Sequence, residues 1–188
     1  MRVISGMYRG RTLRTVADLS VRPATDRVRQ AIFDVLANRL VFDGARILDL
    51  FAGSGSLGIE ALSRGAAHAT FVESARQAAD FISMNLRTLG CEDASEVVET
   101  DALDFLRSAS GPFDLVFADP PYAYEQTAGI PAAVFGSGIV RSGGYLLIEH
   151  PPTTRFPADP AFGAGPVKRF GRTHVTFFAP TEGRKNAP

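Results

Sequence analysis

Short apolar runs that alternate with amphipathic segments are the feature of this sequence that most restricts its fold. From Arg46 onward the pattern predicts strands at 46–51, 69–73, 96–100, 113–118, 144–149 and 175–179. It predicts helices at 56–64, 76–89 and 102–108, and an irregular stretch rich in proline and glycine at 150–166. Strands that alternate with helices specify an α/β fold, a doubly wound and mostly parallel sheet with helices on both faces. Such sheets bind ligands at the carboxyl ends of their strands.

A basic extension precedes the alternating region. Its first part, 1–16, is predicted to form two short strands around a turn at 7–10, and a loop is expected at 18–24. A helix follows with Thr25 as its N-cap, and Arg27 and Arg29 flank its apolar stripe, free to face a partner. The chain is thus expected to divide into a small N-terminal hairpin-plus-helix extension at 1–42, a main domain at 43–180 and a frayed tail at 181–188.

Arginine is concentrated at the start of the chain. Residues 1–30 hold seven arginines against two aspartates, a net charge of +5 in a protein of 188 residues whose overall charge is zero. Guanidinium groups bind phosphates in pairs of hydrogen bonds and stack on bases, so the segment is a candidate nucleic-acid surface. A solvated face that pairs with acidic residues elsewhere is the alternative. The candidate contacts to RNA are Arg9, Arg11, Arg22, Arg27 and Arg29.

The composition excludes several classes of protein. A single cysteine, Cys91, is incompatible with an intramolecular disulfide framework and with a cysteine-rich zinc site. No residue set has the spacing of metal ligands, and no apolar run approaches the roughly 18 residues that a membrane span needs. The first residues lack the apolar stretch of a signal peptide. We expect a cytoplasmic monomer without metal or membrane partner.

The loop after the first predicted strand is the first candidate binding motif. It reads Asp49-Leu-Phe-Ala-Gly-Ser-Gly-Ser-Leu-Gly58 and opens a helix, whose free amide groups and glycines favour a close ligand. Glu73 ends the next strand twenty residues after Gly53, the spacing of a carboxylate that holds a ribose. Asp101 could reach an adenine or merely cap a helix, and Asp49 could face a charged cofactor or a neighbouring loop. The candidate cofactor-binding residues are Asp49, Phe51, Ala52, Gly53, Ser54, Gly55, Glu73, Asp101 and Ala102.

A second motif, Asp119-Pro120-Pro121-Tyr122, follows the fourth predicted strand. Two successive prolines fix an extended backbone, so the carboxylate of Asp119 and the carbonyl of Pro120 can both accept hydrogen bonds from a planar amine. Tyr122 offers a ring on which a base can stack. These four residues are the candidate catalytic residues.

Together the two motifs favour methyl transfer from a sulfonium cofactor to an amine. Such a reaction needs alignment and exclusion of water more than acid or base catalysis. Asp119 would orient the amine and stabilise the positive charge that grows on its nitrogen.

At these residues the chain resembles the RsmD family of bacterial 16S rRNA (guanine-N2)-methyltransferases, which use S-adenosylmethionine. The resemblance covers nearly the whole chain, from the first residues to about Ala179. Its matching stretches are 9–11, 22–29, 49–55, 60–66, 119–122 and 148–150. It implies a Rossmann-like class I methyltransferase fold and rRNA or the small ribosomal subunit as the partner. By position, Gly53 and Gly55 would contact the cofactor, Glu73 its ribose and Asp101 its adenine, while the 119–122 turn would hold the guanine and the N-terminal arginines the rRNA.

Two other functions are compatible with parts of the sequence. The 119–122 turn would serve an adenine-N6 methyltransferase acting on RNA or DNA equally well. Gly53, Gly55, Gly58 and Glu73 also fit the dinucleotide fingerprint of a nicotinamide-dependent oxidoreductase, which leaves the 119–122 turn without a role.

Overall fold

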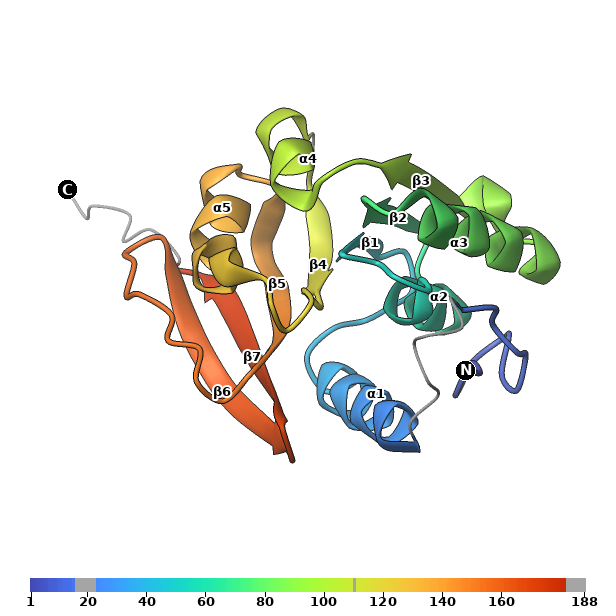
Figure 1. The fold of residues 1–188 in the computed structure, drawn as a ribbon, viewed down its shortest axis with the longest axis horizontal. Coiled ribbons are helices and arrows are strands. Elements are labelled where there is room, and N and C mark those ends of the chain that lie inside the picture. Colours follow the sequence, from blue (N-terminus) through green and yellow to red (C-terminus); the bar gives the residue numbers. More distant parts are fainter. Residues whose placement is uncertain (16–22, 110, 182–188) are drawn as a thin grey trace.

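The computed structural model describes residues 1–15, 23–109 and 111–181, and in them a single sheet with helices on both faces (Figure 1). The seven strands are β1 (Arg46–Leu50), β2 (His68–Glu73), β3 (Ser95–Glu99), β4 (Phe113–Ala118), β5 (Val140–His150), β6 (Phe162–Phe170) and β7 (Thr173–Pro180). The α-helices are α1 (Pro23–Leu36), α2 (Ser56–Ser63), α3 (Arg76–Leu89), α4 (Ala102–Ser108) and α5 (Ile130–Gly136), with 3-10 turns at Glu92–Ala94 and Glu125–Gly129. None of these helices is long and apolar enough to cross a membrane.

The sheet has the order β3-β2-β1-β4-β5-β7-β6. The first five strands are parallel, and β7 pairs antiparallel with both β5 and β6. The chain moves outward from β1 to β3 and then returns to place β4 on the other side of β1. The switch point therefore lies between β1 and β4, as expected for a doubly wound sheet. The predicted α/β class and mostly parallel sheet are confirmed.

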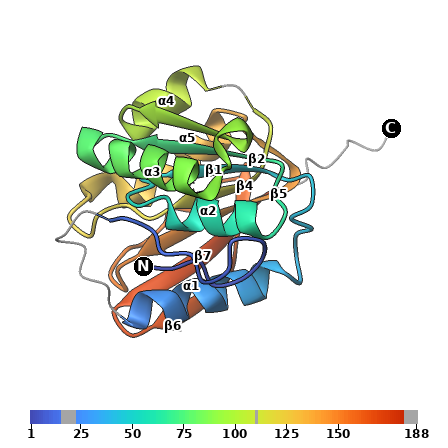
Figure 2. The ribbon, with the colours of Figure 1, turned by 90° about the vertical axis from the view of Figure 1, so that its right-hand side faces the viewer.

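Two apolar layers cover the two faces of the sheet. Helices α1, α2 and α3 pack on one face through residues that include Phe33, Leu57 and Ile82. Helices α4 and α5 pack on the other through residues that include Leu106 and Val134. Figure 2 shows α4 and α5 above the sheet and α1 and α2 below it.

The N-terminal segment docks on helix α2. The buried carboxylate of Glu60 accepts hydrogen bonds from the backbone amides of Ile4 and Ser5 at 2.7 and 3.0 Å. Gly6 lies so close to α2 that a Cβ there would fall 1.8 Å from the carbonyl oxygen of Ser63. Val3 and Leu13 belong to the same apolar layer as β1, so the extension and the sheet share one core. The division at residue 42 stays a prediction.

Three sequence predictions about local structure were wrong. Residues 1–15 form a turn held by one antiparallel bridge, Arg2 with Thr12, rather than two strands. Helix α1 begins at Pro23, not after Thr25, because proline suits the first turn of a helix. The stretch expected to be irregular contains the start of β6, an edge strand that tolerates Gly163 and Pro166.

Candidate active site

The loop after β1 and the turn after β4 lie side by side at the carboxyl edge of the sheet. Leu50, the last residue of β1, pairs in register with Val72 of β2 and with Ala118 of β4. Asp119 follows Ala118 directly. Beyond the strands, the rings of Phe51 and Tyr124 meet edge to face with centroids 5.0 Å apart. The glycine loop and the 119–122 turn are therefore neighbours, as the proposed chemistry requires.

The glycine loop adopts a conformation that few side chains tolerate. Gly53 and Gly55 have φ of 56° and 75°, and Phe51 is left-handed without being glycine, at φ 59°. Strained backbone of this kind is concentrated at ligand sites. Gly58 is different, because a Cβ there would fall 2.4 Å from Cε1 of Phe71. The third glycine of the apparent dinucleotide fingerprint is thus required by helix-to-sheet packing rather than by a ligand.

The two carboxylates expected at the cofactor lie at the ends of β2 and β3. The Glu73 oxygens accept hydrogen bonds from the amides of Gly53 and Ala75, both at 2.8 Å. A carboxylate has about four acceptor positions, so this arrangement fixes Glu73 and leaves it capacity for ribose hydroxyls. Asp101 caps α4, where one oxygen accepts from the amides of Leu103 and Asp104 and the other remains free. The capping alternative is confirmed, and an adenine contact stays a prediction.

Asp49 is buried beneath the loop, with 1% of its surface exposed. One of its oxygens accepts from the amide of Gly58 at 2.9 Å. Burial raises the pKa of Asp49 to about 8, and the negative charges of Asp119 and Glu73 add to the rise. Asp49 therefore holds its own loop, and a cationic ligand above it would favour the charged form of its carboxyl.

The candidate base-binding turn presents its side chains to solvent. Asp119 is exposed, yet desolvation by the protein packed around it raises the pKa of its carboxyl to about 6. Pro120 is buried, whereas the Tyr122 ring is 62% exposed. The geometry leaves a carboxylate and a flat ring available together.

Glu149 of β5 is a functional candidate that sequence reasoning missed. Ile148 pairs in register with Ala118, so Glu149 lies level with Asp119 at the same edge. Burial raises the pKa of Glu149 well above its usual range, the charges of Asp119 and Asp49 raise it further, and Arg29 lowers it. Because register cannot be predicted from periodicity, no sequence signal placed this carboxyl beside Asp119.

Tyr124 is the second residue missed. Its ring packs on Phe51, and burial together with the charge of Asp101 raises the pKa of its hydroxyl. It joins the turn after β4 to the loop after β1. Its position two residues after the 119–122 motif was the only sequence feature that could have indicated a place at the site.

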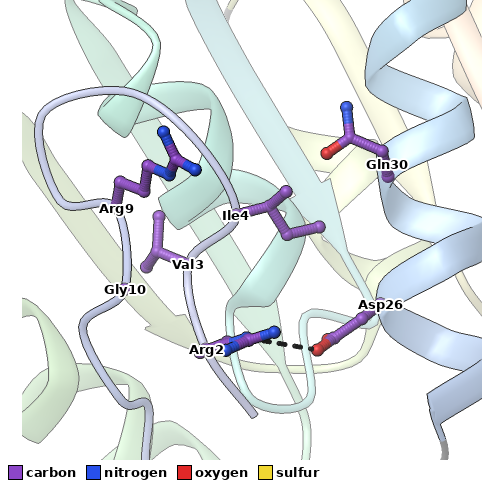
Figure 3. Close-up of a pocket in the computed structure, with 7 residues that line it drawn as sticks. All are labelled: Arg2, Val3, Ile4, Arg9, Gly10, Asp26 and Gln30. Atoms are coloured by element: carbon purple, nitrogen blue, oxygen red, sulfur yellow. Dashed lines mark ion pairs between the residues drawn. The ribbon is translucent and has the colours of Figure 1, made fainter.

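The predicted RNA-binding arginines fall into different environments. Arg9, Arg11 and Arg27 are exposed, and Arg22 lies outside the described residues. Arg9 lines a cavity of about 330 Å³ between the N-terminal turn and α1, together with Arg2, whose guanidinium lies 3.9 Å from Asp26 (Figure 3). Roles in RNA binding stay predictions for the exposed three.

The expectation that Arg29 faces a partner was wrong. Only 3% of its surface is exposed, and its guanidinium donates to the backbone carbonyl of Arg2 and to Asp26 at 3.0 Å. The N-terminal segment covers this turn of α1, so the arginine that flanks the apolar stripe is enclosed. Its charge faces inward, toward Glu60 and Glu149.

A metal site finds no support in the described part of the chain, where no three His, Cys, Asp or Glu side chains could share an ion. That the protein works without a metal stays a prediction.

Comparison with solved structures identifies the fold. The chain is 33% identical to the solved structure of the Escherichia coli protein yhhF, with a TM-score of 0.84 over 96% of this chain and 97% of that one. Magnesium protoporphyrin IX methyltransferase of Synechocystis, solved with bound S-adenosylmethionine, shares the fold at 14% identity and a TM-score of 0.68. The fold is the class I methyltransferase fold. S-adenosylmethionine, the ligand of that neighbour, stays the predicted cofactor of this chain, and the glycine loop with Glu73 and Asp49 is compatible with its ribose and its positive charge.

Sequence relatives identify the family. The family model described as "Conserved hypothetical protein 95" matches residues 1–179. Protein YlbH of Bacillus subtilis is 39% identical over 160 residues, which are 84% of this chain and 86% of that protein. Ribosomal RNA small subunit methyltransferase D of Escherichia coli is 45% identical over 122 residues, which are 65% of this chain and 60% of that protein. The chain belongs to this family, the RsmD family, as its motifs predicted.

Proposed function

We propose that the protein transfers a methyl group from S-adenosylmethionine to the exocyclic N2 amine of a guanine in 16S rRNA. The observation that carries the proposal is the pairing of Leu50 with Ala118, which brings the cofactor loop and the Asp119–Tyr122 turn to one point of the sheet edge. Membership of the RsmD family and the name of its Escherichia coli relative support small-subunit rRNA as the substrate.

In this reaction the protein mainly binds and orients. The Asp119 carboxylate and the Pro120 carbonyl accept the two N–H groups of the amine, which directs the nitrogen lone pair at the methyl carbon. Tyr122 stacks on the guanine ring, a contact worth roughly 1–3 kcal/mol. S-adenosylmethionine supplies an activated methyl group when bound.

Charge at the site favours the transition state. As the new C–N bond forms, the amine nitrogen becomes positive, and the carboxylate of Asp119 lies where that charge develops. Burial raises the pKa of both Asp49 and Glu149, which favours their neutral forms, so the negative charge beside the amine comes from Asp119. The methylated nitrogen then releases its proton readily, so a strong base is not needed.

The test is methylation of defined substrates with radiolabelled cofactor. The protein is incubated with undermethylated small subunits, naked 16S rRNA and duplex DNA, and digestion to nucleosides identifies the labelled base. N2-methylguanine in rRNA is the expected product. N6-methyladenine would replace the guanine assignment by the adenine alternative, and label in DNA alone would overturn the rRNA substrate.

A further inference from the structure

A second cavity, of about 430 Å³, opens at the ends of β5, β6 and β7 and has no part in the methyl transfer described above. Its wall is a row of three side chains that neighbouring strands place side by side. His150 of β5 pairs with His174 of β7, and His174 pairs with Arg169 of β6. Arg155, from the loop between β5 and β6, lines it as well.

The floor of this cavity is buried and neutral. His150 is 5% exposed, and its Nδ1 lies 2.9 Å from the carbonyl oxygen of Pro151. A carbonyl can only accept, so Nδ1 carries the proton and Nε2 accepts from the Thr176 hydroxyl at 2.8 Å. Burial lowers the pKa of His150, and the neighbouring His174 lowers it further. Phe156 packs edge to face on the same ring.

The rim, in contrast, is basic. Arg155 and Arg169 are exposed, and neither forms an ion pair with any residue that the structure describes. Nη1 of Arg155 donates to the carbonyl oxygens of Pro152 and Thr154 at 2.8 and 3.2 Å, which holds the guanidinium over the opening. No acidic side chain lines the cavity. Two neighbouring guanidinium groups without a carboxylate partner, one of them held in place, match a phosphate group.

The cavity also adjoins the turn that holds the target base. The hydroxyl of Tyr122 is hydrogen-bonded to that of Thr173, the residue directly before His174. The residue that anchors the stacking ring and the first residue of the cavity wall on β7 are therefore consecutive in the chain. A nucleotide stacked on Tyr122 would have its neighbours along the strand at this opening.

We propose that this cavity binds a backbone phosphate of the RNA strand next to the target guanine, with Arg155 and Arg169 as its ligands. The proposal rests on the proposed function and deepens it. It adds a second basic contact near β6 and β7, at the edge of the sheet opposite to β3. The RNA strand would therefore be held on the β6 and β7 side of the target base.

The experiment measures the affinity of a fluorescent 16S rRNA fragment as a function of salt, with R155Q/R169Q compared to the unaltered chain. Each lost phosphate contact reduces the slope of log affinity against log salt by about 0.7. Loss of both contacts should lower it by about 1.4 and weaken binding on the order of tenfold at 0.1 M salt. The effect should fall on KM for RNA more than on kcat. An unchanged slope and affinity would overturn the proposal.

The matched control is R39Q/R107Q, which removes the same charge from two residues that do not line the cavity. Arg107 lies in the last turn of α4 and Arg39 just beyond the end of α1, both exposed and both toward the amino edge of the sheet. This variant should keep the slope of the unaltered chain. An equal loss in both variants would mean a general charge effect and would sink the specific site.

Two further variants guard against a structural explanation. R169Q alone spares Arg155 and its backbone contacts. Its slope of log affinity against log salt should fall by about half as much as that of R155Q/R169Q. R155K/R169K keeps both charges and should recover most of the slope.

If R155Q/R169Q impairs only methylation of assembled subunits while binding to naked RNA is unchanged, the cavity contacts a protein and not RNA. Failure of the unaltered protein to methylate any RNA would instead remove the proposed function, which this binding assay does not measure.

Discussion

Replacing Asp119 by asparagine tests the electrostatic half of the proposed mechanism. Asparagine keeps the shape of the side chain and one acceptor oxygen but removes the negative charge beside the amine. A hydrogen bond to a charged group contributes about 1.5–3 kcal/mol, which corresponds to a loss of about 10- to 150-fold in kcat. Asp119→Ala removes the acceptor too, and loss of a preorganised group of this kind costs about 10²–10³ in kcat. We expect kcat to be highest in the unaltered protein, lower in Asp119→Asn and lowest in Asp119→Ala.

The assay is single-turnover transfer of a radiolabelled methyl group to RNA, with the affinity for S-adenosylhomocysteine measured separately by calorimetry. That affinity should stay near normal in both variants, because Asp119 follows β4 and the cofactor loop follows β1. The pH profile adds a second readout. Since the pKa of Asp119 is raised to about 6, the unaltered protein should lose rate as the carboxyl is protonated below that pH. Asp119→Asn should not show this acidic limb.

Asp80→Asn, an exposed carboxylate on α3, is the control for removal of one negative charge. It should retain full activity. A thermal melt separates lost chemistry from unfolding, and Asp119→Asn should melt no lower than the unaltered protein because a desolvated carboxyl is removed. Full activity of Asp119→Ala would refute the proposed contact with the amine.

Three further predictions, made with four substitutions, test the structure around the site. Gly58→Ala should lower the free energy of unfolding by about 1–3 kcal/mol in urea titrations, because its Cβ would lie 2.4 Å from Phe71; an unchanged midpoint would show that the contact can relax. The raised pKa of Asp49, about 8, means that the folded protein binds a proton there which the unfolded chain has released above pH 4. Stability should therefore fall as pH rises from about 4 to 8, and Asp49→Asn should flatten that dependence in urea midpoints measured against pH. Arg29→Gln should lower the free energy of unfolding by about 1.5–3 kcal/mol, because it removes a buried guanidinium that donates to Asp26 and to the carbonyl of Arg2. Arg27→Gln should leave stability intact and weaken RNA binding. The reverse pattern in melts and binding titrations would contradict the assignment.

The alternation of strands and helices was enough to predict the sheet and its ligand edge. Apolar runs such as 113–118 are buried along their whole length, which is the pattern that a parallel strand with helices on both faces must have. β6 was missed for the opposite reason. It is an exposed edge strand whose glycines and proline are tolerated because one side of its backbone needs no partner.

Charged residues with internal partners were the least predictable part of the site. Periodicity assigns Arg29 and Glu60 to the surface, since neither belongs to an apolar stripe. Both are buried because the N-terminal segment covers them and supplies backbone partners from residues more than 25 positions away. Such contacts depend on tertiary packing that no local pattern encodes.

The distribution of charge explains why a neutral chain would need separate basic surfaces to bind RNA. Asp49, Asp119 and Glu149 converge on the sheet edge. Asp119 raises the pKa of both Asp49 and Glu149, and Asp49 raises that of Glu149, because like charges are held close together with little solvent. That potential suits a sulfonium cofactor and an amine that becomes positive, but it repels the phosphates of the substrate. On the proposed function, the exposed arginines must therefore hold the RNA from outside the acidic edge, at the N-terminal extension on one side and at β6 on the other. Binding of the cationic cofactor would lower the repulsion, so the affinity for RNA should be higher in its presence than in the presence of the neutral sulfur product.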